Sequence, residues 1–217
     1  MVNYSRYTND PALEAYRLLR ANLEFVAKKN EARTVLITST GPGAEGKSTI
    51  SVNLAFAFAE IGKRVMLVDA DLRKPRLHKI LSINPDPGLS DILKGQTTPT
   101  EVTRKYLNPH EIEIVPCGTR EKKSAPIIDR LSFTRLLKDL SNNRDLVIVD
   151  SPPLVISDSL SMAASVDGVI LVVSIGESNK RGFRDGLKML ENAEANLLGI
   201  VANKIPHKQK EYYYSYY

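Results

Sequence analysis

Residues 34–50 read Thr-Val-Leu-Ile-Thr-Ser-Thr-Gly-Pro-Gly-Ala-Glu-Gly-Lys-Ser-Thr-Ile, and this stretch decides the fold class. Residues 34–39 are a short apolar run rich in β-branched side chains, which predicts a buried strand. A glycine-rich loop follows, and a helix is predicted over residues 47–61, where Gly62 ends it. Residues 41–48 fit the pattern G-x-x-x-x-G-K-[ST] at every fixed position. A strand, this loop and a helix in that order indicate a phosphate-binding loop, or P-loop.

The residue types in the P-loop have chemical reasons. Glycines let backbone N–H groups wrap around phosphate oxygens, and the helix N-terminus adds a partial positive charge. Lys47 is expected to reach the β- and γ-phosphates, and the Ser48 hydroxyl is expected to ligate Mg²⁺. The alternative is a glycine-rich turn that matches by chance, which the flanking strand and helix disfavour. The candidate nucleotide-binding residues are Gly41, Pro42, Gly43, Ala44, Glu45, Gly46, Lys47, Ser48 and Thr49.

Strand-like and helix-like segments alternate along the rest of the chain. The other predicted strands are 64–69, 112–116, 146–150, 169–175 and 198–203. The other predicted helices are 11–29, 89–94, 100–106, 127–140, 159–165 and 180–193. Because parallel strands need crossover connections, this alternation predicts a three-layer α/β fold with a mostly parallel, doubly wound sheet. At 217 residues we expect one domain over residues 1–207 and a flexible tail over 208–217.

The composition is that of an ordinary globular protein, with 42% hydrophobic and 25% charged residues, which excludes a wholly disordered or fibrous chain. The single cysteine, Cys117, predicts a reducing compartment. The sequence has no membrane-length apolar run and no apolar core of a signal peptide, so we expect a cytoplasmic protein. The net charge of +5 suits an anionic ligand such as a nucleotide. Because the basic residues are spread along the chain, no nucleic-acid partner is expected.

Three of the predicted strands end in an acid or an amide. Asp150 follows an apolar strand and indicates a Walker-B acid that holds Mg²⁺, although acids also end strands without any catalytic role. Asp69 and Asp71 lie two residues apart in an extended segment and therefore share a face. Two acids near a P-loop suggest a metal ligand and a proton acceptor, and the alternative is a solvated pair. Asn203 ends the last strand and is a candidate contact to the nucleotide base.

Three motifs together resemble the bacterial tyrosine kinases, the P-loop kinases of capsule and exopolysaccharide synthesis. They are the P-loop, Val-Met-Leu-Val-Asp-Ala-Asp-Leu-Arg at 65–73, and Leu-Val-Ile-Val-Asp-Ser-Pro-Pro at 146–153. The resemblance covers the chain from about Ala12 to its end. It implies an ATP- and Mg²⁺-dependent protein tyrosine kinase of the P-loop fold that MinD and ParA share.

The resemblance also implies roles for the P-loop lysine and serine and for the acids. Asp71 is our choice for the base that takes the tyrosine proton, with Asp69 on the metal side, and the opposite assignment is open. The implied catalytic residues are Lys47, Asp69, Asp71 and Asp150. The implied metal ligands are Ser48, Asp69 and Asp150.

Both ends of the chain add to the resemblance. Glu14, Arg17 and Arg20 match the family's E-x-x-R-x-x-R oligomerisation motif. On a helix whose apolar stripe runs through Ala12, Tyr16, Leu19 and Leu23, this triad is centred about 140° from the stripe, so we expect it to face mostly outward. The alternative is plain charge pairing on a solvated face. The C-terminal tyrosine cluster matches the family's autophosphorylated tail, and it consists of Tyr212, Tyr213, Tyr214, Tyr216 and Tyr217.

Partners and location also follow from the resemblance. It implies a ring-like homo-oligomer that phosphorylates its tails in trans, a separate transmembrane activator that recruits it to the inner face of the cell membrane, and a tyrosine phosphatase, as in the kinase subunits of Firmicutes. The alternative function is a partition-type regulatory P-loop ATPase that phosphorylates no protein. Such ATPases carry an extra lysine near the start of the P-loop, where this chain has Gly41-Pro42. The tyrosine cluster and the Glu14/Arg17/Arg20 triad also favour the kinase.

Overall fold

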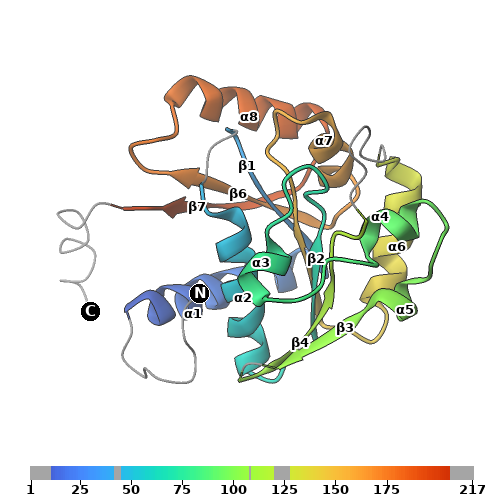
Figure 1. Cartoon of the computed structure of the whole chain (residues 1–217). Helices are drawn as coiled ribbons and strands as arrows, with labels where there is room; N and C mark the ends of the chain where they lie inside the picture. Colours follow the sequence, from blue (N-terminus) through green and yellow to red (C-terminus); the bar gives the residue numbers. More distant parts are fainter. Residues whose placement is uncertain (1–10, 42–44, 108, 120–127, 206–217) are drawn as a thin grey trace.

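The computed structural model describes residues 11–41, 45–107, 109–119 and 128–205 (Figure 1). Seven strands form one sheet in the order β3-β4-β2-β5-β1-β6-β7, and every neighbouring pair is parallel except β3 with β4. The strands are β1 Thr34–Ser39, β2 Val65–Asp69, β3 Arg104–Leu107, β4 Glu111–Val115, β5 Leu146–Asp150, β6 Gly168–Ser174 and β7 Leu197–Asn203. This arrangement confirms the predicted α/β class with a mostly parallel sheet.

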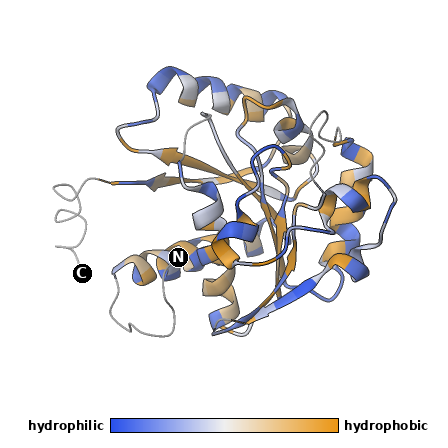
Figure 2. Cartoon of the chain, viewed as in Figure 1, coloured by the Kyte–Doolittle hydropathy of each residue, from blue (hydrophilic) through white to orange (hydrophobic). Residues whose placement is uncertain are grey.

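Helices cover both faces of the sheet. Alternate residues of each central strand point to opposite faces, so Leu146 and Ile148 pack with α1, α2 and α3, whereas Val147 and Val149 pack with α6, α7 and α8. Figure 2 shows this distribution, with hydrophobic strands lying between helices whose outer sides are hydrophilic. The helices are α1 Pro11–Lys29, α2 Lys47–Glu60, α3 Leu77–Leu81, α4 Leu89–Leu93, α5 Pro99–Val102, α6 Arg130–Ser141, α7 Ser157–Ala163 and α8 Lys180–Asn192.

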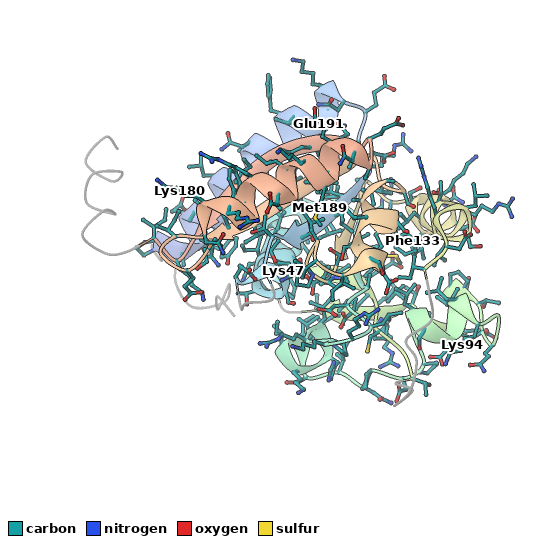
Figure 3. The ribbon with its side chains drawn as sticks, turned by 90° about the horizontal axis from the view of Figure 1, so that it is seen from above. Lys47, Lys94, Phe133, Lys180, Met189 and Glu191 are labelled. Carbon is teal, nitrogen blue, oxygen red and sulfur yellow. The ribbon has the colours of Figure 1, made fainter. Side chains whose placement is uncertain are left out.

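The view from above separates surface from interior. Lys180 and Glu191 on α8 are exposed, whereas Lys47, at the start of α2, is buried (Figure 3). Helix α2 is buried over most of its length because α1 packs on it from outside and the sheet lies beneath. Among the described residues, none of the helices is both long enough and apolar enough to cross a bilayer.

The segment 100–106, predicted as one helix, is instead the end of α5 followed by β3. Glu101 caps α5 by accepting a hydrogen bond from the Thr98 N–H at 2.8 Å, and the chain becomes extended at Thr103. Strand β3 then pairs antiparallel with β4, and the ring of Tyr106 lies 5.9 Å from that of Phe56 in α2. Cross-strand pairing and the packing of this partly buried tyrosine against the core outweigh the local helical pattern. Helix α3 is a further element that the sequence pattern did not indicate.

Helix α1 packs on the core only partly as predicted: Leu23 is buried and Tyr16 and Leu19 pack against the core, but the inward face is wider than the predicted stripe. Its buried residues are Leu13, Leu23 and Ala27. Ala12 is exposed, and the inward stripe passes through Arg17 and Arg20, both of which are half-buried. The expected outward orientation therefore holds for Glu14 but is wrong for the two arginines. Arginine tolerates this position because its aliphatic stem packs against apolar surface while the guanidinium reaches a partner. For Arg17 that partner is Glu60, the last residue of α2, with Nε donating to Oε2 at 3.0 Å.

Candidate nucleotide site

Two of the predicted acids lie next to each other at the carboxyl end of the sheet. Strands β2 and β5 are parallel neighbours, and Asp69 lies directly opposite Asp150 in their register. Both carboxylates are completely buried. Asp71 follows two residues after Asp69, is half-buried, and accepts a hydrogen bond from the Lys74 N–H at 2.9 Å. Residues from distant parts of the sequence are thus brought to the carboxyl end of the sheet, where such folds bind ligands.

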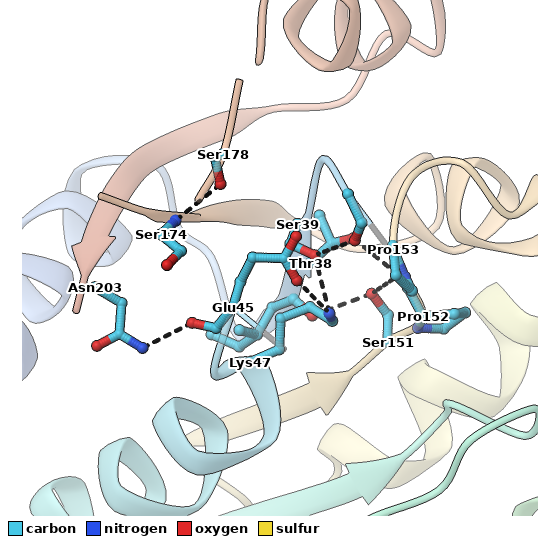
Figure 4. Close-up of polar contacts among 12 residues, drawn as sticks. Thr38, Ser39, Glu45, Lys47, Ser151, Pro152, Pro153, Ser174, Ser178 and Asn203 are labelled. Atoms are coloured by element: carbon cyan, nitrogen blue, oxygen red, sulfur yellow. Dashed lines mark hydrogen bonds and ion pairs between the residues drawn. The ribbon is translucent and has the colours of Figure 1, made fainter. Parts of the chain in front are cut away.

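The P-loop lysine is held in the same region. Its Nζ donates to the Ser39 Oγ at 2.9 Å and lies 3.6 Å from the Glu45 Oε2 (Figure 4). The Lys47 and Glu45 side chains are almost completely buried. Ser39 is the last residue of β1 and Lys47 is the first residue of α2, so the end of the strand positions the ammonium group of the lysine. Pro42, Gly43 and Ala44 lie outside the described residues.

Gly46 and Asn203 close the P-loop against β7. Gly46 has a φ of +96°, and a Cβ there would lie 2.3 Å from the Asn203 Nδ2. That Nδ2 donates to the Glu45 carbonyl oxygen at 2.7 Å (Figure 4). Asn203, which we expected near the nucleotide base, therefore lies at the site with its amide bound to the P-loop backbone. Contact with the base stays a prediction.

The first turns of α2 reach Asp150. The Ser51 Oγ donates to the Asp150 Oδ1 at 3.1 Å, and a hydrogen bond from Ser48 also acts on this carboxylate. Thr49 is exposed. Sequence reasoning missed Ser51 and Ser39. Its spacing was the signal for Ser51. Residues three and four positions apart share a helix face, and Ser51 follows Ser48 by three positions and Lys47 by four.

The segment after Asp150 is braced against β1. Ser151 donates from both its N–H and its Oγ to the Ile37 carbonyl oxygen, each at 3.1 Å. The Thr38 Oγ1 donates to the Pro152 carbonyl oxygen at 3.0 Å. The Leu154 N–H donates to the Ser39 carbonyl oxygen at 2.8 Å. These bonds connect the Asp-Ser-Pro-Pro motif to the strand that leads into the P-loop, so they fix Asp150 relative to Lys47.

Burial raises the pKa of both central carboxyl groups. The pKa of Asp150 rises to about 6 through loss of solvation, partly offset by the Ser48 hydrogen bond and the Lys47 charge. Burial also raises the pKa of Asp69 well above its usual range, and the charges of Asp150 and Asp71 add to that rise. Among the described residues, the Asp69 Oδ1 and the Asp150 Oδ2 are buried oxygens with no hydrogen-bond partner.

Such oxygens suit a small divalent cation. Mg²⁺ prefers hard oxygen ligands, and a bound cation compensates the charge of buried carboxylates that would otherwise repel each other. The donors near the P-loop are a serine hydroxyl and two carboxylates, from Ser48, Asp150 and Asp69, and this set fits Mg²⁺. When bound, such an ion would also neutralise charge on the phosphates of a nucleotide.

Comparison with known proteins agrees with this geometry. Residues 31–212 match the family described as ParA, NUBPL iron-transfer P-loop NTPase. The chain is 30% identical to the putative tyrosine-protein kinase CapB of Staphylococcus aureus, over 94% of this chain and 89% of that protein. It is 33% identical to the tyrosine-protein kinase YwqD of Bacillus subtilis, over 93% and 85%. The chain belongs to the bacterial tyrosine kinase family.

The family relationship extends to three dimensions. The chain is similar to the crystal structure of the chimerical protein CapA2B2, with a TM-score of 0.81 and 30% sequence identity, over 93% of this chain and 88% of that one. The match to the ParA description places the family within the wider P-loop NTPase superfamily, as the resemblance implied. The fold, the P-loop and the two facing acids thus agree with the sequence relationship.

Proposed function

We propose that this protein is an ATP- and Mg²⁺-dependent protein tyrosine kinase that autophosphorylates its C-terminal tyrosine cluster in trans and regulates capsule or exopolysaccharide synthesis and export. One observation carries the proposal. The P-loop Lys47 and the neighbouring acids Asp69 and Asp150 lie together at the carboxyl end of the sheet, in a chain about 30% identical to tyrosine kinases. The proposed acceptors Tyr212, Tyr213, Tyr214, Tyr216 and Tyr217 lie outside the described residues.

The burial of the acids supports a division of roles. Asp69 and Asp150 are fully buried and face each other, which suits metal ligation. Asp71 is half-buried, so part of its surface is open to solvent and to an approaching substrate, which suits a base. A tyrosine hydroxyl has a pKa of about 10 and is a poor nucleophile until its proton is removed.

In the proposed reaction Asp71 accepts the tyrosine proton as the phenolic oxygen attacks the γ-phosphorus. The bond between that phosphorus and the ADP oxygen breaks, and ADP leaves. Lys47 binds phosphate oxygens and neutralises charge that develops in the transition state. Ser48, Asp69 and Asp150 would hold Mg²⁺, which supplies further charge neutralisation on the phosphates when bound.

Partners belong to the same proposal. We propose a ring-like homo-oligomer in which Glu14, Arg17 and Arg20 contribute to the interface and each tail reaches the next subunit. The CapA2B2 chimera supports a separate activator of the CapA type, which we propose to be a transmembrane protein that recruits the kinase to the inner face of the cell membrane. A tyrosine phosphatase would reverse the modification.

The decisive experiment incubates the purified protein with labelled ATP and Mg²⁺ and locates the label. We expect phosphotyrosine in the C-terminal cluster, and none in a Lys47→Met variant. To test transfer in trans, the Lys47→Met protein is mixed with an active protein whose five tail tyrosines are phenylalanine, and label should appear on the former. ATP hydrolysis without phosphotyrosine, including with activator present, would contradict the kinase and favour the partition-type ATPase.

A further inference from the structure

Three chemically different ligand groups converge beside the nucleotide site. Asp69 ends β2, His78 lies on α3, and Cys117 follows β4. One ligand atom from each, a carboxylate oxygen, an imidazole nitrogen and the thiol sulfur, all lie within 4.8 Å of one another. The kinase mechanism proposed above uses Asp69 but assigns no role to His78 or Cys117.

The backbone at Cys117 is fixed on several sides. Strand β4 pairs with β2 up to Val115 opposite Val68, which carries the chain to the side of Asp69. The Cys117 carbonyl oxygen then accepts a hydrogen bond from the Ser90 N–H at 2.9 Å. On either side, the Pro116 carbonyl oxygen accepts from the Leu89 N–H at 2.8 Å, and the Gly118 N–H donates to the Pro85 carbonyl oxygen at 2.9 Å. The backbone that carries the buried thiol is therefore fixed before any ligand arrives.

His78 is positioned through Asp69 itself. The Leu77 N–H, at the start of α3, donates to the Asp69 Oδ2 at 3.2 Å, so the next residue, His78, is held near the carboxylate. The other oxygen, Asp69 Oδ1, is completely buried and makes no hydrogen bond within the described part of the chain. One carboxylate oxygen thus anchors α3, and the second is available to a cation.

We propose that Asp69, His78 and Cys117 form a three-ligand site for Zn²⁺ or a similar borderline transition-metal ion, and that its occupation inhibits the kinase. One sulfur, one nitrogen and one oxygen donor form a ligand set that suits Zn²⁺, whereas Mg²⁺ takes oxygen donors. Water fills the fourth position, as in other three-ligand zinc sites.

Binding converts the Cys117 thiol into a thiolate and releases its proton to solvent, while the hydrated ion gives up all but one of its water ligands. Because Asp69 then serves the transition metal, it no longer serves Mg²⁺ beside Asp150. The inhibitory effect rests on the proposed kinase function, but the binding site does not.

The binding test uses Co²⁺ as a spectroscopic probe for the full chain in magnesium-free buffer. The chain has one cysteine, so a thiolate-to-cobalt charge-transfer band reports on Cys117 alone. We expect that band in the wild type, its loss on adding one equivalent of Zn²⁺, and no band in Cys117→Ser or Cys117→Ala. His78→Asn should weaken Zn²⁺ binding about tenfold or more, since even partners outside the ligand set cost that much. His110→Asn, at one of the other two histidines, is the matched control and should bind like the wild type.

The activity test adds Zn²⁺ in the presence of excess Mg²⁺ and ATP. Autophosphorylation should fall in the wild type and in His110→Asn but persist in Cys117→Ser and His78→Asn. Equal inhibition of all four proteins would overturn the proposal because Zn²⁺ would then act elsewhere. No thiolate band in a folded wild type, or unchanged Zn²⁺ affinity in the Cys117 and His78 variants, would overturn it too. The cobalt measurement needs no kinase activity, so a failure of the kinase assignment leaves it decisive.

Discussion

Asp71 is half-buried whereas Asp150 is completely buried, so we expect substitutions at these two acids to have different effects. We predict that Asp71→Asn keeps the affinity for nucleotide and lowers phosphate transfer by roughly 100-fold or more, because an amide cannot accept the tyrosine proton. Asp150→Asn should in addition weaken Mg²⁺-dependent nucleotide binding. Fluorescent-nucleotide titration with and without Mg²⁺, beside a phosphotyrosine assay, measures both quantities. Identical behaviour of the two variants would show that the division of roles is wrong.

The buried Asp150 makes stability depend on pH. Its pKa is about 6 in the folded protein against 3.8 as the ordinary value, so the folded state binds more protons between those pH values. The free energy of unfolding therefore falls as pH rises through this window, by about 3 kcal/mol once the window is crossed.

Without Mg²⁺ we accordingly expect Asp150→Asn to melt several degrees above the wild type at pH 7.5 and close to it at pH 4. Thermal unfolding followed by circular dichroism in a chelator, at both pH values, provides the comparison. A variant that melts at or below the wild-type temperature at pH 7.5 would show that burial of this carboxylate carries no such cost.

Gly46 combines a left-handed backbone with a close neighbour. Gly62 also has a positive φ, +79°, but a Cβ there would meet no atom within 4 Å, so it is a matched control. We predict that both alanine variants lose about 1–3 kcal/mol of stability from backbone strain. Only Gly46→Ala should also displace Asn203 from the Glu45 carbonyl and lower ATP affinity. Equal ATP affinity in the two variants would show that Asn203 does not support the P-loop.

At the scale of elements, α1 is tied to the end of α2. The Arg17 guanidinium binds Glu60 through two nitrogens and also pairs with Glu14 on the preceding turn of α1. Arg17 lowers the pKa of Glu60 through this hydrogen bonding. Because the lowered pKa belongs to an acid, the pair's contribution to stability is present at neutral pH and is lost as pH falls through the pKa of Glu60 in the folded state.

We predict that Glu60→Gln costs about 1 kcal/mol of stability and increases hydrogen exchange in α1. Glu14→Ala, which removes a more exposed partner of the same arginine, should change neither quantity measurably. Amide exchange followed by mass spectrometry separates α1 from the rest of the chain. Unchanged exchange in Glu60→Gln would show that apolar packing alone holds the helix.

At the scale of the whole molecule, Arg17 and Arg20 are half-buried within their own subunit, and a test of the proposed homo-oligomeric ring must allow for this. Replacing both by alanine should yield monomers with much weaker autophosphorylation if they contribute to the subunit interface. The same substitutions also release α1 from Glu60, so Glu60→Gln is the control that loosens α1 and keeps both arginines. Light scattering should find the oligomer in Glu60→Gln and monomers in the double variant. Monomers in both would assign the effect to docking of α1, and oligomers in both would exclude the arginines from the interface.

The sequence alone determined the sheet class, the P-loop and the three acids. The physical reason is that these features depend on local patterns, namely short apolar runs, the spacing of glycines and lysine, and carboxylates at strand ends. Strands β1, β2 and β5 lie within about one residue of their predicted limits. That Asp69 lies directly opposite Asp150 was not predicted, because it depends on β2 and β5 being neighbours in the sheet.

The tertiary structure decided what depends on contacts between distant segments. β3 is a strand because β4 and Phe56 are beside it, and α1 turns its arginines inward because Glu60 ends the helix beneath. Asn203 binds the P-loop, and Cys117 meets His78 and Asp69, only because β7 and β4 are placed at those positions by the fold. Local propensities differ by less than about 1 kcal/mol per residue, so pairing and packing with distant segments overrule them.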